Sequence, residues 1–413
     1  MLRPRSDKRA VPPRSRTARA MAKRCLGRRA RLPRLAATAL ALGAAACGGA
    51  ARPTAVVDAP LGPAADPMAV SGRLITIAAR PDGQNLVESL DLAGGERSTL
   101  WTTGPEVADW RVSPDGERAA YRAANRSPRA GESIEVRELT EGAVPRVVAS
   151  VDPLAERISG HAFSADGSVL IYARQAVRGD GGASLWLAGA LPGDERRPGN
   201  DRLHRAIGGY PPPAPALALV AWSSALDRAV LREDAPDGGP IAGVGFSAAG
   251  AGTLEAAARS SAPGADALMA AAPDASRVAW LPRDGGAVVI DEGAGGARAV
   301  ASLTAGDRPA GPLFDPEGAV LAFQVVPAAG GPSFVRLVDV REGAPLHDVR
   351  LAGQDLQPLA FAPDGAWLLL GAGAPGVLDP DRLAVAEVAT GALSALAWPP
   401  PAGLWGAAWL PAR

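Results

Sequence analysis

Three residues have the types and positions from which a small polar site could be built. His161 stands two residues before Phe163, and Trp110 stands two residues before Val112, with Arg111 beside it. An imidazole, an indole N–H and a guanidinium group offer hydrogen bonds of different geometry to a single ligand. Trp110, Arg111 and His161 are therefore the candidate binding residues of this chain. The favoured alternative is that they pack between neighbouring structural units and bind nothing.

Other catalytic or metal-binding patterns are missing from the sequence. The three histidines, His161, His204 and His347, each stand alone, without the close spacing of metal ligands. The stretch Gly245–Gly250 resembles a nucleophile elbow, but its second glycine comes one residue too late. Glycine-rich stretches such as Gly293–Gly296 lack the lysine of a phosphate-binding loop. The sequence predicts no metal, no cofactor and no catalytic residue, and therefore a protein that is not an enzyme.

The candidate residues lie beside a turn phrase that recurs along the chain. Its clear copies are Val112–Gly116, Phe163–Gly167, Phe314–Gly318 and Phe361–Gly365, and degraded copies occur at Trp222, Ala271 and Trp409. Pro presets one backbone angle of a tight turn, Asp caps the turn, and Gly supplies a positive φ. Successive copies are 43 to 59 residues apart, near the ~40–50 residues of a propeller blade. The phrase therefore predicts a repeat architecture.

Each copy of the phrase is followed by strand-like runs. An apolar run such as Val169–Tyr172 or Trp367–Leu370 comes first, and a third strand such as Phe334–Val340 follows after a hairpin. A more variable fourth strand closes the unit. Four antiparallel strands in each of several stacked units predict an all-β fold, a β-propeller of seven four-stranded blades. Six or eight blades are the alternatives.

The two ends of the repeat region complement each other. Arg73–Ala78 has the pattern of a second strand and Leu86–Leu92 that of a third, while Leu404–Trp409 is a first strand with no partner after it. We expect the C-terminal strand to complete the N-terminal blade. Such closure removes the open sheet edges that invite aggregation.

The repeated phrases resemble those of the TolB-like and WD40-like β-propellers of bacterial envelope proteins. Leu90–Gly95 matches the Asp-x-x-Gly-Gly element of these repeats, and the resemblance covers about residues 73–413. It departs at an expected insertion over Gly189–Pro215 in the third blade. The resemblance implies a scaffold of the envelope and says little about function, because one fold hosts many functions.

The N-terminus has the pattern of an export signal. Its first 34 residues hold thirteen Arg and Lys and one acid, Asp7, and the apolar run Leu35–Leu42 follows. Cys47 comes after small residues and resembles the acylated cysteine of a bacterial lipobox. We expect residues 1–46 to be a removed lipoprotein signal peptide, 47–70 a flexible Ala/Pro/Gly tether, and 71–413 the propeller. An ordinary cleavage site and a start at Met21 are the alternatives.

The net charge of the chain changes when this leader is removed. The whole chain has 43 basic and 43 acidic residues, and loss of thirteen bases and one acid leaves 30 against 42, a net charge of −12. An acidic body makes nucleic acid an unsuitable partner. Cys25 and Cys47 are the two cysteines of the chain, so no thiol chemistry is expected in the propeller.

These patterns together predict a lipid-anchored, non-catalytic scaffold on the periplasmic face of the cell envelope, at the outer membrane if the source has one. The lipid on Cys47 would lie in the membrane, and the expected partner is an envelope protein or a peptidoglycan-associated ligand. Two alternatives remain. One is a propeller enzyme, a lyase or glycan hydrolase, that uses the axial funnel, and the other is an unanchored periplasmic binding protein.

Overall fold

The computed structural model describes residues 55–59, 70–104, 106–124, 131–152, 154–177, 182–193, 205–210, 216–223, 228–234, 243–248, 256–260, 267–374, 376 and 380–412. The chain divides into Met1–Ala51 and Arg52–Arg413, and the second unit holds all of these residues. The predicted signal peptide and Cys47 lie outside them. Within the described residues, no helix has the length and apolar content that a membrane crossing requires.

The described strands form seven sheets, numbered here in chain order. Sheet 1 contains β29 (Leu404–Leu410), β2 (Arg73–Ala79), β3 (Asn85–Asp91) and β4 (Arg97–Thr103), and sheet 2 contains β5 (Val107–Val112), β6 (Arg118–Ala124), β7 (Glu132–Glu138) and β8 (Arg146–Val151). Sheet 3 contains β9 (Glu156–Phe163), β10 (Val169–Ala176), β11 (Ala183–Gly189) and β12 (Arg205–Tyr210), and sheet 4 contains β13 (Ala216–Ser223), β14 (Arg228–Asp234), β15 (Gly243–Ala248) and β16 (Ala256–Ser260). Sheet 5 contains β17 (Ala267–Ala271), β18 (Val278–Pro282), β19 (Gly286–Asp291) and β20 (Ala297–Leu303), with the short 3₁₀ turn η1 (Gly293–Gly295) between the last two. Sheet 6 contains β21 (Arg308–Phe314), β22 (Val320–Val326), β23 (Phe334–Asp339), β24 (Ala344–Leu351) and β1 (Ala55–Ala59), and sheet 7 contains β25 (Asp355–Phe361), β26 (Trp367–Gly373), β27 (Arg382–Glu387) and β28 (Leu393–Ala395).

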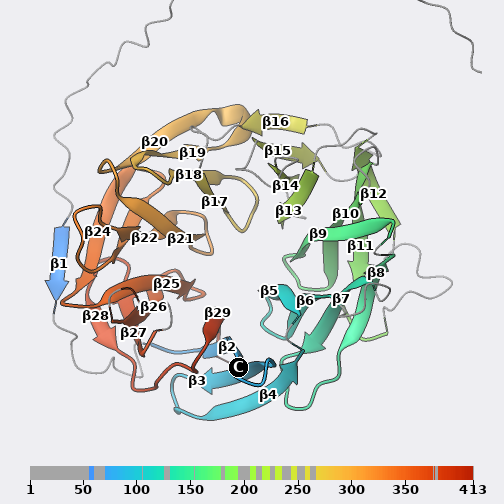
Figure 1. The fold of residues 1–413 in the computed structure, drawn as a ribbon, viewed down its shortest axis with the longest axis horizontal. Helices are drawn as coiled ribbons and strands as arrows, with labels where there is room; N and C mark the ends of the chain where they lie inside the picture. Colours follow the sequence, from blue (N-terminus) through green and yellow to red (C-terminus); the bar gives the residue numbers. More distant parts are fainter. Residues whose placement is uncertain are drawn as a thin grey trace, which may run out of the picture. The chain divides into compact units, whose positions relative to one another are not determined.

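The sheets follow one another around a common centre, with the first strand of each sheet innermost (Figure 1). Within each sheet the neighbouring strands of the repeat pair antiparallel, as between β9 and β10 or β22 and β23. This arrangement is the predicted all-β propeller. The described residues make seven sheets.

The turn phrase folds as its residue types predict. In the third repeat the amide of Gly167 donates to the carbonyl oxygen of Ser164 at 2.9 Å, and Gly167 has a φ of 68°. The Asp166 carboxylate accepts hydrogen bonds from the Ser164 hydroxyl at 2.6 Å and from the Ser168 amide at 3.0 Å. The hydrogen bond from Ser164 is the largest cause that lowers the pKa of Asp166 to about 2. The carboxylate is therefore a charged cap that fixes the start of the second strand.

The C-terminal strand closes the first sheet, as predicted. β29 pairs antiparallel with β2, and Trp409 lies opposite Leu74. Trp409 is buried, and its Nε1–H donates to the carbonyl oxygen of Ser71 at 3.1 Å. Two segments at opposite ends of the repeat region thus share one sheet.

Packing between neighbouring sheets supplies the core. Ile75 and Trp101 of sheet 1 form one buried cluster with Ala119 and Tyr121 of sheet 2. Equivalent clusters join sheets 5 and 6 and sheets 6 and 7. Each sheet therefore buries both of its faces, which explains why the strands after the turn phrase are almost continuously apolar.

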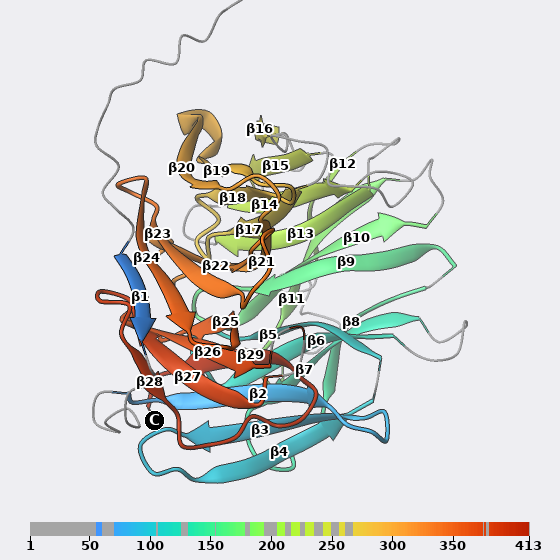
Figure 2. The same ribbon diagram turned by 60° about the vertical axis from the view of Figure 1, so that its left-hand side comes forward.

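Two segments depart from the sequence-based expectations. Within the predicted tether, β1 pairs parallel with β24, from Ala55 opposite His347 to Ala59 opposite Leu351. Figures 1 and 2 show β1 along the outer edge of β24. The two valines of this segment favour a strand, and the edge of β24 offers unpaired backbone groups. The expected insertion in the third repeat contains β12, which is the fourth strand of sheet 3.

Removal of the Trp409 side chain should weaken the closure. Because loss of a buried Trp side chain costs about 3–5 kcal/mol, Trp409→Ala is expected to lower the free energy of unfolding by that amount. Trp405 lies on the same strand but is 44% exposed, so Trp405→Ala is the matched control and should cost clearly less. Urea denaturation followed by circular dichroism measures both. Equal losses would contradict this role of Trp409.

Candidate functional site

The innermost strands share an irregularity near the centre of the ring. The register between β5 and β6 shifts at Asp109, and a similar shift occurs in β9 at Gly160 and in β21 at Gly311. These three residues each stand three positions before the end of their strand, and their φ angles are 52°, 112° and 52°. Such bulges bend a strand and redirect its side chains.

Asp109 occupies a backbone conformation for which the two other strands use glycine. A positive φ is unfavourable for a residue with a Cβ, although Asp adopts it more readily than most. At Gly160 a Cβ would overlap the carbonyl oxygen of Leu219, so glycine lets β13 approach β9 closely. The bulge in β5 has room for a side chain and places a carboxylate there. Strained residues of this kind occur preferentially at functional sites.

Beside Asp109 lies a cavity of about 260 Å³ that is formed by sheets 2, 3 and 4. We name it the arginine cavity, because four arginines and a single carboxylate line it: Arg111, Arg122, Arg157, Arg232 and Asp109. Glu132 lies next to the lining, with a carboxylate oxygen 3.8 Å from the Arg122 guanidinium group. Four guanidinium groups, Asp109 and Glu132 together have a formal charge of +2. The cavity therefore has the electrostatic character of an anion-binding site.

The arginines of the cavity differ in their partners. The Arg122 Nε lies 3.2 Å from an Asp109 carboxylate oxygen, and the same guanidinium group donates to the carbonyl oxygen of Ile158 at 3.0 Å. Arg157 donates to the Gln175 side-chain oxygen at 3.1 Å. Arg111, in contrast, makes no hydrogen bond or ion pair with the described residues. Arg111 is therefore a cation of the cavity with free hydrogen-bond donors.

The surroundings of Arg111 raise the free energy of its charged form when no anion is bound to it. Its side chain is exposed to solvent in the cavity, but protein surrounds the cavity on several sides. Desolvation lowers the pKa of Arg111, and the nearby charge of Asp109 partly opposes this effect. The guanidinium group remains protonated, since arginine does not lose its proton under physiological conditions. An anion at this position would relieve the unfavourable desolvation.

His161 lies behind these charged groups. It is 1% exposed, and burial followed by the positive charge of Arg111 lowers its pKa to about 4. The negative charge of Asp109 and the carbonyl oxygen of Ala120 act in the opposite direction. Neither ring nitrogen makes a hydrogen bond of normal geometry with the described residues. The imidazole is therefore neutral at pH 7 and has unused hydrogen-bonding capacity.

The three residues singled out from the sequence have different positions. Arg111 lines the cavity, and His161 lies close enough to it for their charges to interact. Trp110 packs against the buried cluster between sheets 1 and 2, beside Gly406. Trp110 thus takes part in inter-sheet packing, and its Nε1–H has no hydrogen-bond partner among the described residues.

Sequence analysis missed Asp109, Arg122, Arg157 and Arg232. Some signals for them exist in the repeat. Asp109 stands where the third and sixth repeats have Gly160 and Gly311, and Arg122 and Arg232 occupy equivalent positions of the second strand. Alignment of the repeats against one another would have shown Asp109 at a position where two other repeats have glycine.

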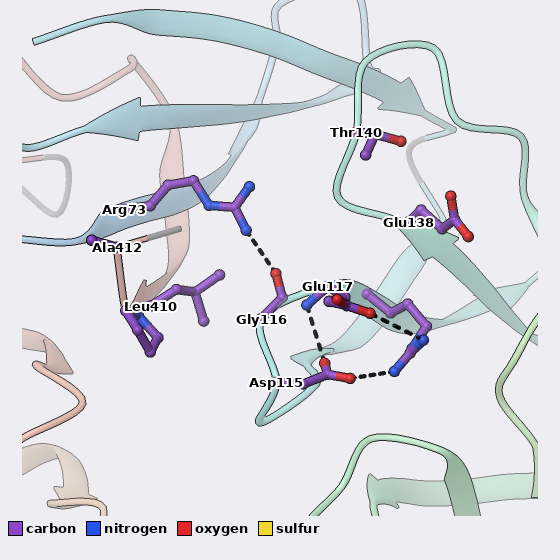
Figure 3. A pocket seen from close by; sticks show the side chains of 10 residues that line it. Arg73, Asp115, Gly116, Glu117, Glu138, Thr140, Leu410 and Ala412 are labelled. Atoms are coloured by element: carbon purple, nitrogen blue, oxygen red, sulfur yellow. Dashed lines mark hydrogen bonds and ion pairs between the residues drawn. The ribbon is translucent and has the colours of Figure 1, made fainter. Parts of the chain in front are cut away.

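A larger cavity, of about 540 Å³, lies at the closure between sheets 1 and 2. Figure 3 shows Arg73 directed toward Gly116, with Asp115 nearby on the same turn. The Arg73 guanidinium group donates to the carbonyl oxygen of Gly116 at 2.7 Å, and Arg118 forms an ion pair with Asp115. The hydrogen bond of Arg73 connects β2 of sheet 1 to the turn of sheet 2, and the ion pair lies beside this turn, so we assign this cavity a structural role. No cluster of three or more metal-ligating side chains occurs in the described ranges.

Comparison with known proteins supports the fold. The sequence matches no protein-family model and no curated protein. Among solved structures, a puromycin hydrolase is similar with a TM-score of 0.56 and 14% identity, over 80% of this chain and 53% of that one. A prolyl endopeptidase is similar with a TM-score of 0.54 and 14% identity, over 82% and 50% of the two chains. TolB from Acinetobacter baumannii has a TM-score of 0.44 and 15% identity, over 83% and 67%.

These similarities and the sheet topology define the chain as a β-propeller protein. The predicted all-β propeller fold is confirmed by the topology of the sheets. The chain spans about half the length of the puromycin hydrolase and the prolyl endopeptidase. At this level of identity, the similarity concerns the fold.

The prediction that the chain is not an enzyme is wrong. It rested on the absence of sequence motifs, yet two of the similar structures are enzymes, a puromycin hydrolase and a prolyl endopeptidase. A propeller fold is therefore compatible with catalytic proteins. Motif searches also overlook groups that come together from distant strands, as Arg111 of β5 and Arg232 of β14 do here.

The buried His161 should make the protein sensitive to acid. Its folded-state pKa of about 4 lies below the ordinary value of 6.5, so its contribution to stability is complete above pH 6.5 and is lost as the pH falls toward 4. The loss amounts to about 3 kcal/mol. His161→Gln should remove this part of the acid destabilisation in urea denaturation at several pH values. His347→Gln is the control and should retain it. Parallel pH profiles for wild type and His161→Gln would contradict the assignment.

Proposed function

We propose that this protein is an exported β-propeller, anchored in the cell envelope through a lipid on Cys47, that binds an anionic group in the arginine cavity. The group would belong to an envelope protein or to a peptidoglycan-associated ligand. One observation carries the binding part of this proposal: Arg111 faces the cavity without a hydrogen-bonding or ion-pair partner among the described residues, while desolvation lowers its pKa.

The chemistry of the cavity lining supports an anionic ligand. Guanidinium groups present several N–H donors in a planar fork that matches carboxylate and phosphate groups. Because protein partly encloses the cavity, the attraction between a guanidinium group and an anion is stronger than it would be in bulk water. Asp109 orients Arg122 through their ion pair, so part of the lining is fixed before the ligand arrives.

The sequence supports export and anchoring. A basic region, the short apolar run Leu35–Leu42 and the small residues before Cys47 occur in the order of a lipoprotein signal. A propeller held at a membrane through an N-terminal lipid would present its ring of loops to partners in the envelope. The arginine cavity would then be a recognition site of this ring.

Removal of the Arg111 charge should weaken anion binding. Hydrogen bonds to charged groups contribute about 1.5–3 kcal/mol, so Arg111→Gln is expected to lower the affinity for succinate or inorganic phosphate roughly 10-fold to 100-fold. Isothermal titration calorimetry at low ionic strength measures this change. The control is Arg341→Gln, which removes an exposed arginine outside the cavity. Equal affinities of wild type and Arg111→Gln, with both proteins folded, would refute the anion site.

The lipid anchor has a separate test. Expressed in a bacterium with a lipoprotein pathway, the wild-type protein should enter the detergent phase after Triton X-114 extraction. Cys47→Ser removes the acylated thiol and should move the protein to the aqueous phase, while its circular dichroism spectrum stays unchanged. Cys25→Ser is the matched control, because this cysteine lies inside the predicted leader. An aqueous wild-type protein would contradict the anchor and favour an unanchored binding protein.

A further inference from the structure

A second cavity, of about 390 Å³, is lined by residues of sheets 6 and 7 and by Arg283, which follows β18 of sheet 5. The starts of the innermost strands β21 and β25 contribute to its lining, which includes Arg308, Asp355 and Gln357. It shares no lining residue with the arginine cavity. Its volume lies within the ~300–1,000 Å³ that are typical of small-molecule sites.

Three charged side chains line this second cavity: Arg283, Arg308 and Asp355. Arg283 already takes part in another interaction, so Arg308 and Asp355 are the opposite charges that have no ion-pair partner among the described residues. Arg308 is exposed and makes no hydrogen bond or ion pair with the described residues. Asp355 accepts hydrogen bonds from the amides of Ser333 at 2.6 Å and Gly376 at 2.7 Å, but no cation among the described residues forms an ion pair with it. A single cavity thus presents a cation and an anion at separate places.

Backbone amides keep the carboxylate of Asp355 ionised. Burial alone would raise the pKa of Asp355, but the hydrogen bonds from Ser333 and Gly376 outweigh it and lower the pKa. These bonds also fix the position of the carboxylate. Arg308 keeps its charge because an arginine side chain does not deprotonate under physiological conditions. Both charges are therefore present at neutral pH.

The rest of the lining offers a hydrogen-bonding amide and an apolar wall. Gln357 makes no hydrogen bond with the described residues, and its side chain lies over Gly371, where a Cβ would come within 3.0 Å of the Gln357 Nε2. Gln324 donates to the Ser333 hydroxyl at 2.7 Å and is held in place. Pro309, Val326 and Pro380 contribute apolar surface. The cavity thus combines separated charges with an apolar region.

We propose that the second cavity binds a free α-amino acid with an apolar side chain. The carboxylate of the ligand would lie beside Arg308, its ammonium group beside Asp355, and its side chain against Pro309, Val326 and Pro380. A zwitterion satisfies Arg308 and Asp355 at once, whereas a simple anion or cation would leave one of these two without a counterion. The free amide of Gln357 would add a hydrogen bond that fixes the orientation of the ligand.

The test uses the full chain and isothermal titration calorimetry with L-leucine, L-valine and L-proline as probes. At least one of these amino acids should bind, and two matched analogues should bind at least 10-fold more weakly. For leucine these are 4-methylpentanoate, which lacks the ammonium group, and 3-methylbutylamine, which lacks the carboxylate. Analogues that bind as well as the amino acid would overturn the proposal, as would a folded protein that binds none of the three amino acids at millimolar concentration.

Two variants locate the binding to this cavity. Arg308→Gln and Gln357→Leu should each weaken amino-acid binding, Arg308→Gln by at least 10-fold, while Arg341→Gln should leave it unchanged. Substitution of Asp355 is a less suitable test, because its carboxylate also accepts hydrogen bonds from the amides of Ser333 and Gly376 and the change would disturb the local fold. Arg111→Gln should retain amino-acid binding, which keeps this test separate from that of the arginine cavity. Unchanged affinity in both Arg308→Gln and Gln357→Leu would refute the assignment.

Discussion

The pairing of β29 with β2 is the interaction on which the rest of the propeller depends. A sheet in the ring buries its faces against two neighbours, as the shared clusters between sheets 1 and 2 and between sheets 5 and 6 show. If the ring opened between the first and last repeats, the apolar faces on both sides of the gap would become exposed. The backbone hydrogen bonds of one strand pair therefore stabilise contacts far beyond their own sheet.

Closure also determines what the centre of the ring can contain. Innermost strands converge there, so their backbones must approach closely or bend. Gly160 has no side chain, which allows β9 to lie close to Leu219 of β13. Asp109 has the equivalent place in β5 and keeps its side chain at the cost of an unfavourable φ. The second and third repeats thus have different residues at this position, Asp109 and Gly160, and both residues line the arginine cavity.

Much of the fold was predictable from the sequence, and much of the candidate site was not. The turn phrase has a local physical cause, since Asp166 and Gly167 form their turn with residues within a few positions of them. The closing strand was predictable because Leu404–Leu410 has the pattern of a first strand without a second. In contrast, Arg122, Arg157 and Arg232 come from three sheets, and their proximity depends on the packing of those sheets around the ring. Arg111 and His161 were found because both lie next to the repeated phrase, whereas the second cavity lies at the other end of its strands.

The position of β1 has a consequence for the distance between the propeller and a membrane. Eight residue steps separate Cys47 from Ala55, the first residue that pairs with β24. A fully extended chain of this length spans roughly 28 Å, so a lipid on Cys47 would keep the outer edge of sheet 6 close to the bilayer surface. If β1 left β24, the next residue bonded to a sheet would be Ser71, which accepts from Trp409. It lies 24 steps from Cys47, and the reach would grow to roughly 84 Å. Under the proposed anchoring at Cys47, this one short parallel strand would limit the distance between the ring and the membrane.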